Sequence, residues 1–202
     1  MEEKKLEIFY DHYKDTFEIQ KTYLQRRNNY SLIALLLLVV LSFQISNPEQ
    51  TVQISNEIIK QHIGEISINF AFINSLLLFA FLWIIIMYFQ INLIIDRYYK
   101  YIQDIEKKLS ENLTPFEISR EGKTYLKQYP WISYLVHRIY TIAFPLTLIL
   151  VACVKWKAEI NLYKENLCNG HFLFDSAIIF GLILLTVLYL TKVHFNDFKK
   201  KT

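Results

Sequence analysis

Four long stretches of the chain carry no acidic or basic side chain, and they limit the folds that it can adopt. Asp, Glu, Lys and Arg are absent from residues 28–48, 66–95, 139–154 and 176–191. A helix that crosses a bilayer needs roughly 20 mainly apolar residues. The first two stretches are long enough, and the last two are long enough if Arg138 and Asp175 lie at the membrane interfaces. A soluble bundle would have to bury all of residues 66–95, so we expect an all-α, polytopic membrane protein with four transmembrane helices.

The basic residues are divided unequally between the segments that join these helices. The expected spans are about 28–47, 68–95, 132–154 and 172–191. Seventeen Lys and Arg residues precede the first span, separate the second from the third, or follow the fourth, whereas the two other connecting segments hold four. Cytoplasmic segments carry the excess of Lys and Arg. Both termini are therefore expected on the cytoplasmic side.

Apolar side chains at helical spacing predict that helices 1 and 2 extend into the cytosol, over about residues 3–27 and 96–131. A stripe recurs every three, four or seven residues in each part. The first stripe consists of Leu6, Phe9, Tyr13, Phe17 and Leu24, and the second of Ile95, Tyr99, Ile102, Ile105 and Leu109. We expect the two extensions to pack together, and the whole chain, residues 1–202, to form a single membrane domain.

The sequence lacks the residue spacings of known catalytic and metal sites. Its 4 Gly residues are scattered, and it has neither a phosphate-binding loop nor a His-Glu-x-x-His or zinc-type Cys pattern. We therefore expect no enzyme activity, no cofactor and no metal site. Cys153 and Cys168 both fall on the expected outer side, where a disulfide and two free thiols are equal alternatives.

Polar residues in the second span indicate a possible ion path. Asn74, Phe81, Ile85, Tyr88 and Asn92 share one helix face, which is polar at its ends and apolar in the middle. In a ring of identical subunits such a face could form a hydrophobic gate between two wet vestibules. Asp175 would add negative charge at the outer mouth and favour cations. The alternative is ordinary hydrogen bonding between helices by Asn and Gln side chains.

A belt of basic residues is expected just below the membrane on the cytosolic side. Its members, the candidate ligand-binding residues, are Lys21, Arg26, Arg27, Arg97, Lys123 and Lys127. Tyrosines are interleaved with them, so Arg and Lys could hold the phosphates of a nucleotide or short single strand while Tyr stacks on its bases. The alternative is the positive-inside signal together with contact to anionic lipid.

Several short strings resemble small four-span membrane proteins of bacterial anti-phage defence. They are residues 9–15 (FYDHYKD), residues 26–29 (RRNN), residues 120–123 (REGK) and the pair Tyr129-Pro130. The chain resembles the Hailong-type membrane effectors first and the membrane subunit of Kiwa-type systems second. The Hailong resemblance implies a homotetrameric ion channel, held closed on its cytosolic side by a nucleic-acid oligomer that a partner nucleotidyltransferase makes. The Kiwa resemblance implies a membrane scaffold that senses disturbance and recruits a soluble partner.

These observations lead to two hypotheses from different classes. The first is a ligand-gated, homo-oligomeric ion channel of the bacterial inner membrane, a tetramer by the Hailong resemblance, that stops the growth of infected cells. Its partners are the lipid bilayer, further copies of the chain, and a nucleotide or oligonucleotide with the enzyme that makes it. The second is a non-conducting scaffold or sensor that docks a soluble defence protein through its cytosolic helices.

Overall fold

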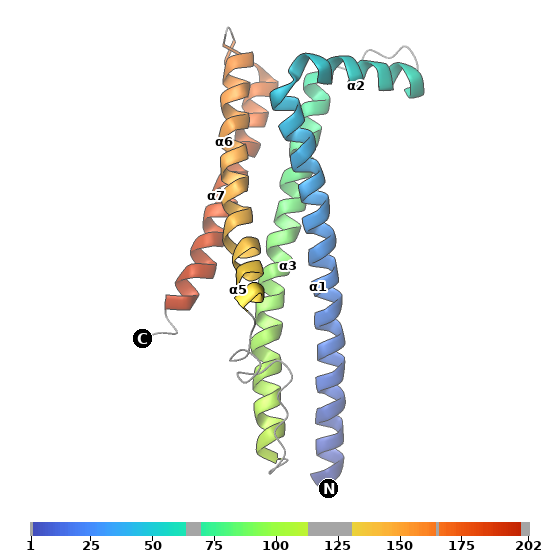
Figure 1. The fold of residues 1–202 in the computed structure, drawn as a ribbon, viewed down its shortest axis with the longest axis vertical. Helices are drawn as coiled ribbons and strands as arrows, with labels where there is room; N and C mark the ends of the chain where they lie inside the picture. Colours follow the sequence, from blue (N-terminus) through green and yellow to red (C-terminus); the bar gives the residue numbers. More distant parts are fainter. Residues whose placement is uncertain (1, 64–69, 113–130, 165, 199–202) are drawn as a thin grey trace. The chain divides into compact units, whose positions relative to one another are not determined.

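The structure is a computed structural model that describes residues 2–63, 70–112, 131–164 and 166–198. Within these ranges every regular element is a helix and no β-strand occurs (Figure 1). The elements are α1 (Glu2–Ser46), α2 (Pro48–Ile63), α3 (Phe70–Asn112), α5 (Trp131–Arg138), the π-helix η1 (Ile139–Ala143), α6 (Phe144–Leu162) and α7 (Gly170–Phe198). The expected all-α class is confirmed for the described residues.

Four helical segments are long and apolar enough to cross a membrane, as the charge-free stretches predicted. They are Lys4–Ser46, Phe70–Glu111, Ile139–Leu162 and Gly170–Val193. The third segment lies further along the chain than the predicted 132–154. The prediction ended this span before the first charged residue, whereas α6 continues for two more turns to Leu162. Lys155 and Glu159 consequently lie inside the third candidate span and not in an outer loop.

The chain divides into two compact units, and both α1 and α3 contribute to each of them. Unit 1 consists of residues 1–31 and 87–137, and unit 2 of residues 32–86 and 138–202. Each unit therefore has its own helix packing. That the whole chain forms a single membrane domain stays a prediction.

In unit 1 the two apolar stripes of α1 and α3 pack against each other, as predicted. The core consists of Tyr13, Ile102, Ile105 and Leu109, with Leu6, Phe9 and Phe17 packed against it. Three polar or aromatic contacts join the same two helices. The Tyr13 hydroxyl donates a hydrogen bond to Glu106 Oε1 at 3.0 Å, His12 Nε2 lies 2.8 Å from the Tyr101 hydroxyl, and the rings of Tyr23 and Tyr98 are 5.4 Å apart.

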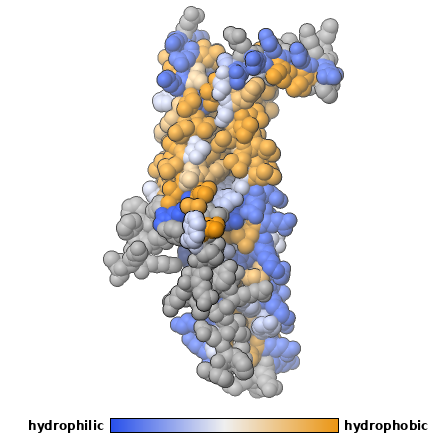
Figure 2. All heavy atoms as spheres, in the orientation of Figure 1, coloured by the Kyte–Doolittle hydropathy of each residue, from blue (hydrophilic) through white to orange (hydrophobic). Residues whose placement is uncertain are grey.

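In unit 2, α6 and α7 form a helical hairpin, and residues 163–164 and 166–169 lie between the two helices. The Asn169 side chain caps α7, because its Oδ1 accepts a hydrogen bond of 2.9 Å from the backbone N–H of His171. Figure 2 shows a largely hydrophobic surface along the visible part of the hairpin, with hydrophilic residues gathered at its turn. Large apolar side chains such as Leu150 and Phe180 are exposed on it, by 64% and 67%.

A π-helical turn begins α6 just before a proline. The backbone N–H of Phe144 bonds to the carbonyl of Ile139, five residues earlier, and Pro145 follows directly. Proline has no N–H and cannot make the usual bond to the carbonyl four residues before it. The wider turn accommodates this missing bond, and such turns are typical next to proline in long helices.

The α2 helix was not expected from the sequence. Residues 46–67 were expected to be an outer loop, but the chain changes direction at Asn47 and α2 runs across the end of α1 (Figure 1). Ile54 and Ile58 lie one turn apart on α2 and are both about half exposed, at 46% and 54%. The Thr51 hydroxyl bonds back to the carbonyl of Asn47 at 2.8 Å and stabilises the first turn.

Candidate functional site

The candidate site of unit 2 lies where a buried helix face changes from apolar to charged. On α6 the buried positions follow one another at steps of three and four: Pro145, Leu148, Ala152, Lys155 and Glu159. This spacing keeps all of them on one side of the helix. The last two turns of that side therefore carry an ammonium and a carboxylate where the preceding turns carry aliphatic side chains.

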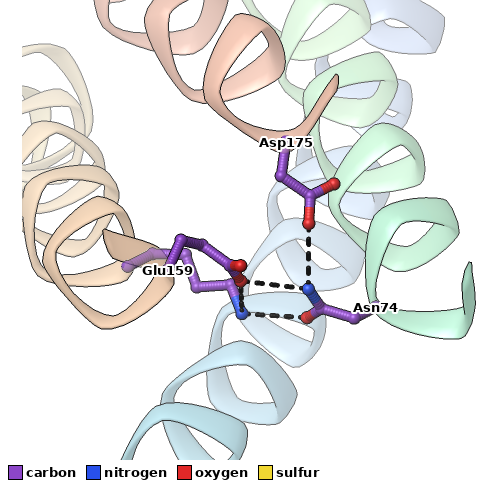
Figure 3. A network of polar contacts seen from close by, with 4 residues as sticks. Asn74, Glu159 and Asp175 are labelled. Atoms are coloured by element: carbon purple, nitrogen blue, oxygen red, sulfur yellow. Dashed lines mark hydrogen bonds and ion pairs between the residues drawn. The ribbon is translucent and has the colours of Figure 1, made fainter. Parts of the chain in front are cut away.

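Four side chains from three helices form one polar cluster, made of Asn74 on α3, Lys155 and Glu159 on α6, and Asp175 on α7 (Figure 3). Lys155 Nζ forms an ion pair with Glu159 Oε1 at 2.9 Å and donates a hydrogen bond to Asn74 Oδ1 at 2.8 Å. Asn74 Nδ2 in turn donates to Glu159 Oε1 and to Asp175 Oδ2, both at 3.1 Å. Asn74 thus connects the hairpin of α6 and α7 to α3.

These contacts determine the orientation of the Asn74 amide. Its oxygen accepts from an ammonium, and its nitrogen, which has two hydrogens, faces two carboxylates. The flipped amide would place its NH2 group against Lys155 and its oxygen against Glu159 and Asp175, and would lose all three bonds. The arrangement is therefore selective for an amide, because neither an aspartate nor a leucine has both a donor and an acceptor.

The cluster is buried and carries more negative than positive charge. Lys155, Glu159 and Asp175 are 7%, 2% and 1% exposed. Lys155 compensates Glu159, but among the described residues no basic group lies within ion-pair distance of Asp175. Three buried oxygens here also lack a hydrogen-bond partner: Glu159 Oε2, Asp175 Oδ1 and Ser75 Oγ. Ionisable groups in this setting are costly, and in membrane helices they mark functional sites.

The turn between α6 and α7 adds aromatic and titratable groups beside the cluster. The rings of Tyr163 and Phe172 are 5.9 Å apart. Burial and the negative charges of Glu159 and Asp175 raise the pKa of Tyr163 above its usual value of 10.0. Tyr163 therefore remains a neutral phenol at physiological pH. His171 lies one turn before Asp175 on α7 and acts on it electrostatically.

The structure buries most of the predicted pore residues inside a single chain. Asn74 and Asp175 meet in the cluster, while Phe81, Ile85 and Tyr88 are at most 1% exposed and Asn92 is half-buried. Asp175 was expected at an interface with the headgroups or at an open mouth. It lies in the interior instead, because Asn74 and the α6 face offer it polar partners there. That these residues line an ion path stays a prediction.

The predicted basic belt is only partly within the described residues. Lys21, Arg26 and Arg97 are exposed, Arg27 is half-buried, and Lys123 and Lys127 lie outside the described residues. Lys21 pairs with Glu18 at 2.7 Å, Arg26 lies over the Tyr23 ring at 5.8 Å, and Arg27 donates to Asn28 Oδ1. The contact of Tyr23 with Tyr98 brings the segment that carries Arg26 next to the one that carries Arg97.

Cys153 and Cys168 are free thiols in the structure, and both are exposed. The disulfide alternative is not the one observed. Cys153 lies within α6, about 14 Å along the helix axis before Leu162, at the usual rise of about 1.5 Å per residue. Cys168 lies in the turn beyond that end. A disulfide needs Cα atoms within about 7 Å.

Sequence reasoning missed Lys155 and Glu159. The signal that could have found them is their spacing, because they continue the series of buried positions on α6 and stand four residues apart. Comparisons of the chain with models of protein families, with curated proteins and with solved structures found no match.

Proposed function

We propose that this chain is a multi-pass membrane protein that conducts cations and binds them at the cluster of Asn74, Lys155, Glu159 and Asp175. The observation that carries the proposal is the burial of three ionisable side chains between helices that are long and apolar enough to cross a membrane. Charged groups at such positions are typical of ion and proton pathways.

The distribution of polarity supports membrane insertion. In the four candidate spans, large apolar side chains such as Val39, Leu150, Phe180 and Leu188 are 57–67% exposed, whereas Asp175 is 1% exposed. In a water-soluble protein burial favours the opposite arrangement. Lipid chains would cover the exposed apolar side chains at no cost in hydration, so a bilayer is the solvent that this surface fits.

Charge and the neighbouring core support cation selectivity and gating. The net negative charge of the cluster attracts cations, and the buried aromatic and aliphatic side chains of Phe81 and Ile85 on the same α3 face form a hydrophobic barrier. We place the cluster on the outer side and both termini in the cytoplasm, because the connecting segments divide their basic residues in that way.

The resemblance to Hailong-type effectors supports the wider assignment. On it rests the proposal that the chain forms a homo-oligomer in a bacterial inner membrane, a tetramer in the first instance, and acts in anti-phage defence. The exposed basic residues Lys21, Arg26 and Arg97 are then the described part of the binding site for an anionic ligand.

Cation flux from liposomes that contain the purified full chain tests the proposal. We expect flux from the unaltered protein, a severalfold lower flux for Asp175→Asn, and a higher flux for Phe81→Ala, which widens the barrier. Glu57→Gln, an exposed carboxylate on α2, is the matched control and should leave flux unchanged. Flux that is suppressed by short oligonucleotides would also locate the cytosolic ligand site.

The scaffold hypothesis has one observation in its favour. Ile8 and Ile19 are 63% and 45% exposed on α1 in unit 1, where a soluble partner could cover them. Absence of flux from all four proteins, with and without oligonucleotide, would contradict the conduction proposal and favour the scaffold.

A further inference from the structure

The charge of the buried cluster does not balance if all its groups are ionised. Lys155 contributes one positive charge, and Glu159 and Asp175 contribute two negative charges. The Lys155–Glu159 pair is neutral as a unit, with 2.9 Å between Nζ and Oε1. Asp175 accepts a hydrogen bond from the amide of Asn74, which is neutral and does not compensate its charge. An uncompensated charge in the apolar interior costs several kcal/mol, so groups there tend to be neutralised.

Two buried oxygens beside the cluster lack hydrogen-bond partners, and one of them belongs to the carboxylate whose charge is not compensated. Asp175 Oδ1 and Ser75 Oγ are both buried, and neither has a hydrogen-bond partner. Ser75 follows Asn74 on α3, and its hydroxyl lies near Asp175, where it could donate a hydrogen bond to an ionised carboxylate or accept one from a protonated carboxyl group. A carboxyl group protonated at Oδ1 becomes a donor, and a serine hydroxyl is an acceptor. A hydrogen bond donated by Ser75 would leave the excess negative charge in place, whereas protonation of Oδ1 would neutralise that charge and turn the Ser75 hydroxyl into an acceptor.

We propose that Asp175 carries one exchangeable proton on Oδ1, so that the cluster holds a single proton and is electrically neutral when occupied. The Lys155–Glu159 pair remains ionised beside it, and Asn74 holds the second oxygen of Asp175 in place. The proton comes from hydronium: one O–H bond of the hydronium ion breaks as the new O–H bond to Oδ1 forms, and a neutral water molecule is released. That the proton is also the cation conducted by the protein rests on the proposed function.

The groups around Asp175 come from each element packed against it. Asn74 and Ser75 on α3 are uncharged, Lys155 and Glu159 on α6 cancel each other, and His171 lies one turn before it on α7. Tyr163 in the turn stays neutral. Among the described residues outside the cluster, His171 is the basic side chain that acts on Asp175 electrostatically.

Infrared spectroscopy of the full-length protein in lipid can count protonated carboxyl groups directly, because the carbonyl stretch of a protonated acid is absent from a carboxylate. We expect one such band per chain at pH 7, which shifts when the protein contains isotopically labelled aspartate. Absence of the band at pH 7 would overturn the proposal. A band that shifts with labelled glutamate and not with labelled aspartate would overturn the assignment to Asp175.

Three substitutions change the charge balance in different directions. Asp175→Asn removes the acid, and Glu159→Gln leaves Lys155 to compensate an ionised Asp175, so both should lose the band. Lys155→Met leaves two carboxyls without a cation and should show two bands. Glu57→Gln should keep one band. If all the variants kept one band, the proton would lie on another residue and the proposal would fail.

The outcomes separate this inference from the proposed function. The band with no flux of any ion would support the proton site and contradict conduction. Flux of K⁺ but not of protons, with no band at pH 7, would support conduction and overturn the proton site, leaving an alkali cation as its occupant. A pH-sensitive and a K⁺-sensitive dye enclosed in the same liposomes distinguish the two fluxes.

Discussion

Both units bury a carboxylate between paired helices, but they surround it in opposite ways. In unit 1, Glu106 is 3% exposed and accepts a hydrogen bond from Tyr13, next to a core of Ile102, Ile105 and Leu109. The outside of this pair carries exposed ion pairs such as Lys14–Asp11 and Lys107–Glu111. In unit 2 the ion pair lies inside, between Lys155 and Glu159, and the outside is apolar.

The contrast is in where charge is placed: on the exposed side of the helix pair in unit 1, and between the helices in unit 2. Surface ion pairs stabilise little in water because solvent already satisfies the charges. A buried ion pair needs geometry and further hydrogen bonds to offset the loss of hydration, and Asn74 supplies these bonds to both partners.

The largest expected difference is in how far a water-soluble reagent labels the two thiols, Cys153 and Cys168. Both are exposed in the chain, but Cys153 is on the apolar side of α6 and Cys168 is in the polar turn. In membranes we expect a water-soluble maleimide to label Cys168 almost completely and Cys153 hardly at all, because a thiolate forms only in contact with water. Two single-cysteine variants measure this: Cys168→Ser, which keeps Cys153, and Cys153→Ser, which keeps Cys168. Equal labelling in intact membranes would contradict insertion of α6.

Removing an ion-paired lysine should lower the free energy of unfolding far more in unit 2 than in unit 1. Lys155→Met breaks a buried pair and should lower the free energy of unfolding by about 3–5 kcal/mol. Lys14→Met breaks an exposed pair of 3.5 Å and should change it by less than about 1 kcal/mol. Denaturant unfolding of both variants in the same detergent gives the comparison. Equal losses would show that the two ion pairs lie in similar surroundings.

The smallest expected effect concerns the carboxylate in unit 1. Tyr13→Phe removes the hydroxyl that donates to Glu106 and should cost about 1–3 kcal/mol, since a buried acceptor loses a donor. Tyr10→Phe is the matched control, because Tyr10 is 43% exposed and keeps its ring contact with Tyr13 in this variant. Denaturant unfolding in the same detergent measures both variants. If Tyr10→Phe lowered the free energy of unfolding as much as Tyr13→Phe, the buried hydrogen bond would not be the cause.

Structural features that rest on a repeated sequence pattern could be predicted, whereas contacts between individual polar side chains could not. Long charge-free runs identified four candidate spans, and the spacing of residues such as Tyr13 and Ile102 identified the helix pair of unit 1, because both signals repeat over many positions. Asn74 and Asp175 were selected as functional residues, but for an open path. Their partners Lys155 and Glu159 were missed because the first charged residue was taken to end the span. A charged side chain can also lie on the buried side of a helix, as these two do.

The α2 helix was missed for a related reason. Its 16 residues mix Ile with Glu, Gln, Ser and Asn, so that the segment is amphipathic but too polar to span a membrane. What defines it is the change of direction at Asn47 and the bond from Thr51 back to that residue. Such local geometry leaves only a weak trace in composition.

Asn74 also makes the electrostatics of the cluster depend on how α3 is turned. All of its three hydrogen bonds run from one α3 side chain to partners on the α6–α7 hairpin. A rotation of α3 by one residue, about 100° about its axis, would break all three bonds at once. Both carboxylates would lose a donor and Lys155 an acceptor in the same movement. A twist of one helix would thus be converted into a change in how strongly the neighbouring hairpin holds positive charge.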